Sequence, residues 1–96
     1  MPFILQNMKN KQVYACMLVN HYELAYYGVK YWDTRDDALE QSQQFLQERG
    51  EALPIEWEVK EIEDRKMKLC NVKLKNDPTL DLFEMDYETY EARRRE

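Results

Sequence analysis

Residues 32–50 read WDTRDDALEQSQQFLQERG, and this stretch decides the fold because it carries a helix start, an apolar stripe and a helix stop together. Asp33 or Thr34 can accept hydrogen bonds from the N–H groups of the first turn, and two further aspartates suit the positive end of the helix dipole. Gly50 supplies the left-handed residue that ends many helices. The apolar stripe has helical spacing, which predicts that one face of the helix packs on a sheet. It comprises Ala38, Leu39, Ser42, Phe45 and Leu46.

Two runs of strand-forming residues precede this helix and predict a hairpin. Residues 12–20, QVYACMLVN, are apolar on both faces, and residues 24–32, LAYYGVKYW, are rich in aromatic side chains. The polar residues between the two runs predict the turn. Gly28 inside the second run predicts a bulge or a close backbone approach, and it leaves room beside Tyr26. Alternation along this run indicates a core face. That face comprises Ala25, Tyr27, Val29 and Tyr31.

Three further segments follow the helix. Residues 55–63, IEWEVKEIE, alternate cleanly and predict a strand. A turn is expected at residues 64–66, and a second strand at residues 67–75, MKLCNVKLK, with a bulge at Leu69 and Cys70 where the alternation changes parity. Residues 76–78, NDP, then form a strong turn signal.

The C-terminal tail admits two interpretations. A strand at residues 80–85, pairing back on residues 67–75, followed by a helix at about residues 86–94, is favoured because acids precede arginines as the helix dipole prefers. The alternative is one continuous helix from Pro78. Its stripe would comprise Leu80, Phe83, Tyr87 and Tyr90.

The predicted element order is ββαβββα within one α+β domain that spans residues 1–96. We expect an antiparallel sheet of four to five strands with the main helix packed on one face and a short C-terminal helix. This length supports a single modest core. Residues 1–11 form either a short strand or a loose N-terminal segment, and residues 86–96 form a helical tail.

Composition limits the environment of the protein. The longest apolar run, residues 13–19, is too short to span a bilayer, and the N-terminal residues lack the pattern of a secretory signal, so a cytoplasmic location is expected. Cys16 and Cys70 both lie in apolar patterns, which predicts buried free thiols rather than a disulfide. The net charge is −5, yet residues 65–75 are basic while the flanking segments are acidic.

The inventory of reactive side chains argues against an enzyme. His21, the only histidine, lies near Glu23 in a predicted turn, and Ser42, the only serine, lies on the inward helix stripe, so a catalytic triad is not expected. Glu56 and Glu58 share one strand face and point at water rather than into a cleft.

Metal and cofactor sites are not expected either. The two cysteines are far apart in the sequence and belong to no C-x-x-C motif, and one histidine cannot complete a zinc site. The acidic clusters at residues 33–37 and 61–64 lack the spacing of a calcium-binding loop. The only two glycines are far apart, so no phosphate-binding loop exists.

The remaining features favour a small acidic, non-enzymatic protein-binding module, an adaptor or inhibitor. Interface centres favour Tyr and Trp, so an aromatic sheet face is one candidate surface, with a homodimer as its simplest use. The acidic tail is the other, because its carboxylates could imitate phosphates in the groove of a basic nucleic-acid-binding protein. An ordinary solvated helix face is the plainer interpretation of that tail. The candidate partner-binding residues are Tyr22, Tyr26, Tyr31, Trp32, Asp81, Glu84, Asp86, Tyr87 and Tyr90.

The alternative is a single-stranded nucleic-acid-binding domain in which strand aromatics stack on bases and a lysine-rich strand follows the phosphates. The net acidic charge argues against it, because phosphate binding depends on neutralising cations. Its candidate lysines are Lys66, Lys68, Lys73 and Lys75.

Overall fold

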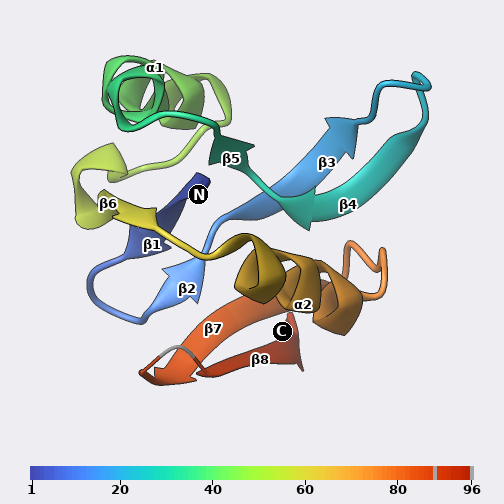
Figure 1. The fold of residues 1–96 in the computed structure, drawn as a ribbon. Helices are drawn as coiled ribbons and strands as arrows, with labels where there is room; N and C mark the ends of the chain where they lie inside the picture. The colour runs from blue at the N-terminus through green and yellow to red at the C-terminus, as the bar shows by residue number, and fades with distance from the viewer. Residues whose placement is uncertain (88, 96) are drawn as a thin grey trace.

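The computed structural model describes residues 1–87 and 89–95, and it confirms the α+β class (Figure 1). The positions 88 and 96 of the predicted C-terminal helical tail lie outside the described residues. The strands are β1 Phe3–Asn7, β2 Gln12–Val13, β3 Ala15–Val19, β4 Ala25–Val29, β5 Tyr31–Trp32, β6 Trp57–Glu61, β7 Leu80–Asp86 and β8 Thr89–Arg94. The helices are α1 Arg35–Glu48 and α2 Asp64–Leu74, with a short 3-10 turn at Pro54–Glu56.

Strand β1, in the segment for which the sequence left the structure open, is the centre of the main antiparallel sheet. Strand β6 pairs with its full length along one edge, from Phe3↔Glu61 to Asn7↔Trp57. The opposite edge is shared by β5 and β2, and β7 and β8 continue the sheet beyond β2. The main sheet has six strands, while β3 and β4 form a separate two-stranded sheet. The predicted order ββαβββα is therefore too short, because it omits β1 and misassigns two later elements.

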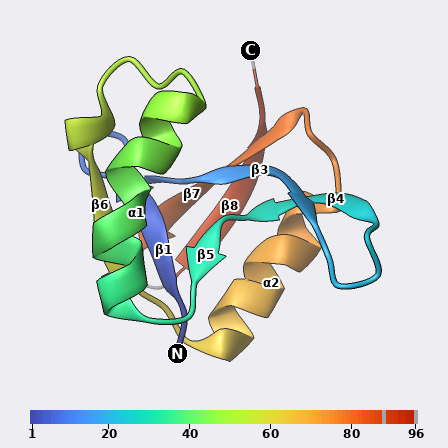
Figure 2. The same cartoon turned by 90° about the horizontal axis from the view of Figure 1, so that it is seen from above.

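All five residues of β1 are buried because a helix covers each face of the strand. Ile4 belongs to a hydrophobic cluster with Cys70 and Leu74 of α2, whereas Phe3 and Leu5 belong to a second cluster with Leu46 of α1. Adjacent strand residues point to opposite faces, so one short strand serves both clusters. Figures 1 and 2 show α1 and α2 on opposite sides of β1. The expectation of a single core is corrected to two.

Helix α1 confirms the central prediction. The Thr34 side chain accepts from the Asp37 backbone N–H at 3.1 Å, and Gly50 has the expected positive φ of 80°. Ala38, Ser42 and Leu46 are buried against β1, β5 and β6, as the stripe predicted. Leu39, at the border of that stripe, is instead 59% exposed.

Helix α2 corrects the predicted turn at residues 64–66 and strand at residues 67–75. Cys70 and Leu74 are buried and Met67 packs beside them, which is an i, i+3, i+7 spacing. The break in the alternation at Leu69 and Cys70, interpreted from sequence as a bulge in a strand, therefore reflects the period of a helix. The helix ends at Lys75, which adopts a left-handed conformation with φ of 55°. The following Asn76–Pro78 turn is confirmed, since Asp77 Oδ1 accepts from the Thr79 backbone N–H at 2.9 Å.

The tail forms a hairpin, so the predicted helix at residues 86–94 is wrong. Strand β7 confirms the strand expected at residues 80–85, but it pairs with β2 and β8 rather than with residues 67–75. Tyr90 points inward and is 3% exposed. One acid and one arginine lie opposite each other across the hairpin, in the pair Asp81↔Arg93, and Asp81 also forms an ion pair with Arg95 at 2.8 Å. Acids followed by arginines along the chain are therefore compatible with two paired strands as well as with a helix.

Candidate functional site

The most distinctive surface feature is the β3–β4 hairpin, residues 15–29, here called the hairpin arm. The predicted hairpin is confirmed, with register from Ala15↔Val29 to Val19↔Ala25. Asn20 builds its turn, because its Oδ1 accepts from the backbone N–H groups of Tyr22 at 2.9 Å and Leu24 at 3.1 Å. Figure 1 shows the tip of the arm projecting beyond the main sheet and α1, while Figure 2 shows β4 running beside α2. Its tip is therefore supported by its own turn alone.

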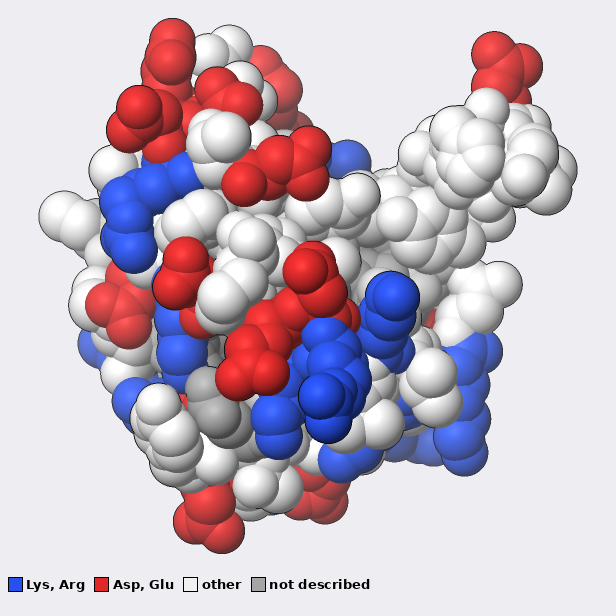
Figure 3. Space-filling model, in the orientation of Figure 1, with Lys and Arg blue, Asp and Glu red and all other residues white. Residues whose placement is uncertain are grey.

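The hairpin arm is almost free of charge, although the chain carries a net charge of −5. Glu23, at its tip, is the one charged side chain between Gln12 and Val29. Figure 3 shows the arm as an uncharged projection that ends in this acid. Large apolar side chains lie exposed along it. They are Met17 at 46%, Val19 at 68%, Tyr22 at 72% and Leu24 at 62% exposure. Contiguous exposed apolar groups on a soluble domain mark interaction surfaces.

The two long edges of the arm are treated differently. In an antiparallel pair, residues that bond across the pair alternate with residues whose N–H and C=O groups point outward. Lys30 N–H donates to the Tyr14 carbonyl and Asn20 N–H donates to the Leu24 carbonyl, so the even-numbered residues form the bonds inside the hairpin. The odd-numbered N–H groups therefore point outward. On β4 two of these groups, those of Tyr27 and Val29, are satisfied by asparagine side chains. Asn76 accepts from Tyr27 N–H at 2.6 Å, and Asn71 accepts from Val29 N–H at 2.9 Å.

On β3 the outward backbone groups of Met17 and Val19 pair with no described residue. No Lys, Pro or bulge protects this edge, although exposed edge strands usually carry such devices. The free edge is thus both unpaired and apolar. A strand of another polypeptide could add to it through main-chain hydrogen bonds.

The base of the arm is firmly held, in contrast to its tip. Tyr27 donates from its hydroxyl to the Leu80 carbonyl at 2.7 Å and accepts from Arg95 Nη2 at 3.2 Å. Gly28 confirms the predicted close approach, because a Cβ there would lie 2.8 Å from the Tyr26 ring and 2.9 Å from Asn71 Oδ1. The hydrogen bonds of Tyr27 to Leu80 and Arg95 therefore anchor the base of the strand pair that carries the free edge.

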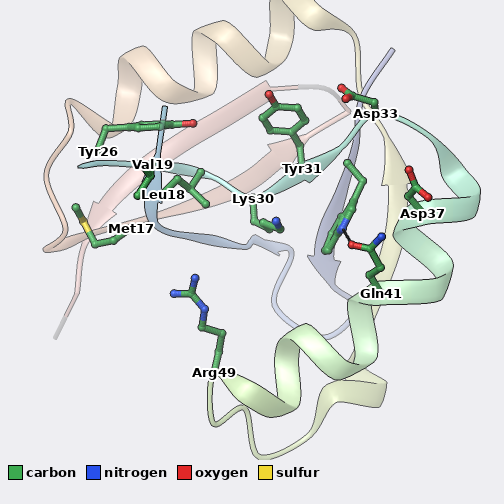
Figure 4. Close-up of a pocket in the computed structure, with 11 residues that line it drawn as sticks. Met17, Leu18, Val19, Tyr26, Lys30, Tyr31, Asp33, Asp37, Gln41 and Arg49 are labelled. Atoms are coloured by element: carbon green, nitrogen blue, oxygen red, sulfur yellow. Dashed lines mark hydrogen bonds between the residues drawn. The ribbon is translucent and has the colours of Figure 1, made fainter. Parts of the chain in front are cut away.

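A hollow of about 550 Å³ lies beside the arm, between β3 and α1. Figure 4 shows Arg49 pointing from the end of α1 toward β3, with Lys30 nearby. Lys30 Nζ lies 4.8 Å from the centre of the Trp32 ring, and Arg49 Cζ lies 5.0 Å from that of Phe45. Neither cation forms an ion pair with a described residue. The hollow thus holds two cations, Lys30 and Arg49, together with the acids Asp33 and Asp37.

The structure separates the predicted aromatic residues. Tyr22 is exposed at the tip, whereas Tyr26 and Tyr31 line the hollow. Trp32 is 7% exposed, and its indole N–H donates to Gln41 Oε1 at 3.1 Å, so it is not a surface residue. The predicted faces fail here because β4 ends at Val29 and β5 joins another sheet, which exchanges the orientations of Tyr31 and Trp32.

Most of the acidic candidates in the tail are engaged within the molecule. Asp81 pairs with Arg95 at 2.8 Å, and Glu84 accepts from Lys60 at 2.7 Å and from Gln6 at 2.8 Å. Tyr90 is a core residue, so its prediction as a contact residue is wrong. Asp86 and Tyr87 remain exposed where the β7–β8 hairpin turns. Asp86 is thus the one exposed acid among these candidates, and together with Tyr87 it does not make a continuous acidic surface.

The four candidate lysines lie on α2 or at its end rather than on a strand. Lys73 donates from Nζ to the Tyr90 carbonyl, and Lys66 is half-buried. Lys68 and Lys75 are exposed. They share the outer face of the helix with two exposed apolar side chains, Leu69 and Val72, not with the predicted tyrosines.

The histidine, the serine and the two cysteines do not come together in one site. His21 is exposed at the arm tip and stacks on Tyr22 with ring centres 4.0 Å apart, whereas Ser42 is buried in α1. Cys16 and Cys70 are free and buried, as predicted. Burial raises the pKa of the Cys70 thiol to about 12, so it is protonated at neutral pH. Among residues 1–87 and 89–95, no three metal-ligating side chains gather into a site.

Neither helix in the described part of the chain has the length and apolar character needed to cross a bilayer. No protein-family model, curated protein or solved structure matches this chain. The free edge of β3 was missed by the sequence analysis. The nearly uncharged run at residues 12–29 was the signal that could have pointed to it.

Proposed function

We propose that this chain is a non-enzymatic protein-docking module and that the hairpin arm is its docking element. The observation that carries the proposal is the contrast between the edges of the arm. Two asparagines satisfy the outward N–H groups of Tyr27 and Val29 on β4, while those of Met17 and Val19 on β3 have no partner among the described residues. Docking by strand addition supplies main-chain hydrogen bonds to these groups and covers exposed apolar side chains.

The character of the surface supports a protein as the ligand. An uncharged edge gives no electrostatic attraction to a phosphate backbone, which dominates nucleic-acid affinity. The candidate lysines lie on α2, and Tyr22 lies at the tip of the arm. The nucleic-acid alternative therefore has less support. The two buried free thiols support the cytoplasmic location that forms part of the proposal.

Site-specific photo-crosslinking in the producing cells tests this function. A photoreactive phenylalanine analogue replaces Val19 in one variant and Ile55 in another. Ile55 is a matched control, since it is apolar and 78% exposed but lies in the turn before β6. We expect covalent adducts with a polypeptide chain from position 19 and few from position 55. Equal yields at both positions would contradict docking by the arm. Adducts that disappear on nuclease treatment would favour the nucleic-acid alternative instead.

A further inference from the structure

The free edge of β3 has a geometry that suits pairing with the same strand of a second copy. Met17 and Val19 both direct their N–H and C=O groups outward, because the inward pairs of the hairpin fall on even-numbered residues. Two such edges placed antiparallel about a two-fold axis satisfy each other. Pairing joins the two hairpins into one four-stranded sheet. It also brings the exposed side chains of Met17 and Val19 against their counterparts.

Charge makes a second copy a better occupant than an unrelated acidic or basic chain. Two copies with a net charge of −5 repel each other overall, and the arm is a surface where they can meet with few charges opposed, since Glu23 is its one charged side chain. A basic partner gains little from an edge that carries one acid at its tip. The edge of β3 is best matched by another apolar, uncharged strand, and β3 of a second copy is such a strand.

The charges at the ends of the arm also match in this arrangement. Antiparallel pairing runs the tip of each arm toward the base of the other. The tip carries Glu23, the single acid of the arm, while the hollow beside the base is lined by the cations Lys30 and Arg49 and by the acids Asp33 and Asp37. Figure 4 shows the two aspartates farther from β3 than Arg49. Neither of these cations forms an ion pair within the described chain. Figure 4 shows Arg49 directed toward β3, on the side where an added strand would lie.

We infer that the partner of the hairpin arm is a second copy of this chain, docked edge to edge through Met17–Val19, with Glu23 of each copy facing Arg49 of the other. This inference rests on the proposed function, since it names the occupant of the same edge. It makes the assembled form a symmetric dimer in which the two arms cross as one continuous sheet.

Sedimentation equilibrium across a range of protein concentrations tests the inference. We expect a monomer–dimer equilibrium whose dissociation constant rises about tenfold or more in Val19→Lys, because a desolvated lysine would replace an apolar contact. Ile55→Lys makes the same chemical change at an exposed site outside the arm and should leave the equilibrium unchanged. Circular dichroism checks that both variants fold. A wild-type dimer that Val19→Lys leaves intact would overturn the edge pairing.

A charge exchange tests the orientation of the pair. Glu23→Arg and Arg49→Glu should each weaken the dimer by roughly threefold to tenfold, and the double variant should recover most of that loss. Failure of the double variant to recover would overturn the antiparallel arrangement. A chain that stays monomeric at every concentration would overturn the second copy as partner. In that case crosslinking from position 19 to another protein would still uphold the proposed function, and its absence would remove both.

Discussion

The side-chain oxygen Oδ1 of Asn71 accepts a hydrogen bond at 2.9 Å from the backbone N–H of Val29, so α2 closes the edge of a strand that belongs to the hairpin arm. Asn76 repeats the arrangement at Tyr27, two residues earlier in β4. Asn71 of α2 and Asn76, just beyond the end of that helix, thus supply side-chain acceptors in place of the neighbouring strand that a sheet would provide. The opposite edge of the arm has no such cover among the described residues, and this asymmetry defines the docking surface.

Removing the asparagine tests how much that cover contributes. Asn71→Ala leaves the N–H of Val29, a residue 1% exposed, without its acceptor. We expect a loss of about 1–3 kcal/mol in the free energy of unfolding, measured by urea denaturation. Lys68→Ala, on the exposed face of the same helix, serves as control and should change stability by less than about 0.5 kcal/mol. Equal effects of the two substitutions would show that the bond does not support β4.

Gly28 tests the packing at the base of the arm. Its backbone adopts no positive φ, so the effect of Gly28→Ala comes from crowding, with the new Cβ 2.8 Å from the Tyr26 ring and 2.9 Å from Asn71 Oδ1. We expect Gly28→Ala to lower the free energy of unfolding by about 1–3 kcal/mol, measured by thermal or urea denaturation. In a double-mutant cycle, Tyr26→Ala should relieve part of this loss, since the Asn71 contact remains. Strict additivity of the two changes would contradict the crowding.

Glu84 of β7 bonds to Lys60 of β6 and to Gln6 of β1, and its side chain is 9% exposed. Glu84→Ala should lower the free energy of unfolding by about 1.5–3 kcal/mol, because Lys60 and Gln6 lose a charged acceptor. Glu91 provides the comparison, since its pair with Arg93 is exposed on both sides and spans 3.5 Å. Glu91→Ala should cost less than about 0.5 kcal/mol, as exposed ion pairs usually do. A reversed ranking of the two variants in urea denaturation would refute the structural role of Glu84.

The buried thiol and tyrosine hydroxyls, which are neutral in the folded protein, predict that its stability falls at alkaline pH. Burial raises the pKa of the Cys70 thiol from 9.0 to about 12, and it also raises the pKa of the Tyr14 and Tyr27 hydroxyls. The stabilisation is complete below pH 9 and is lost as the pH rises toward 12, because the unfolded chain ionises first. We expect the free energy of unfolding to fall by on the order of 2 kcal/mol between pH 8 and 10.5.

The control for this alkaline effect is Cys70→Ala, which removes the thiol with the largest upward shift. Its free energy of unfolding should be lower at neutral pH, because a small cavity is left, but should decline less steeply as the pH rises. Denaturation curves at several pH values make the comparison. Parallel declines in the two proteins would show that Cys70 is not the group responsible.

The parts of the fold that could be predicted from sequence have local signals. Helix α1 has a capping threonine, a stripe and a terminal glycine, and the hairpin arm has two apolar runs around a polar turn. Helix α2 has no such start, since Glu63 makes no side-chain capping bond, and its lysines between apolar residues imitate the alternation of a strand. Strand β8 was missed because its arginines follow the acids of β7 in the order that favours a helix dipole, whereas in the hairpin Arg93 lies opposite Asp81.

The candidate site was only partly predictable for a related reason. The aromatic and uncharged character of the hairpin is local, so Tyr22 could be singled out from sequence alone. The cover of the β4 edge depends on Asn71 and Asn76, which reach β4 from more than forty residues away. The burial of Trp32 likewise depends on the pairing of β5 with β1 at Phe3. Contacts between distant segments decide both features, and no local pattern encodes them.

Residue-resolved hydrogen exchange at low and high protein concentration is the most direct test of the docking edge. The amides of Tyr27 and Val29 should be protected at every concentration, because Asn76 and Asn71 bond to them within one chain. The amides of Met17 and Val19 should exchange fast in dilute solution and become protected as the concentration rises, when a second copy supplies their acceptors. Rapid exchange of Met17 and Val19 at all concentrations, with the protein folded throughout, would contradict pairing of the β3 edge with a second copy.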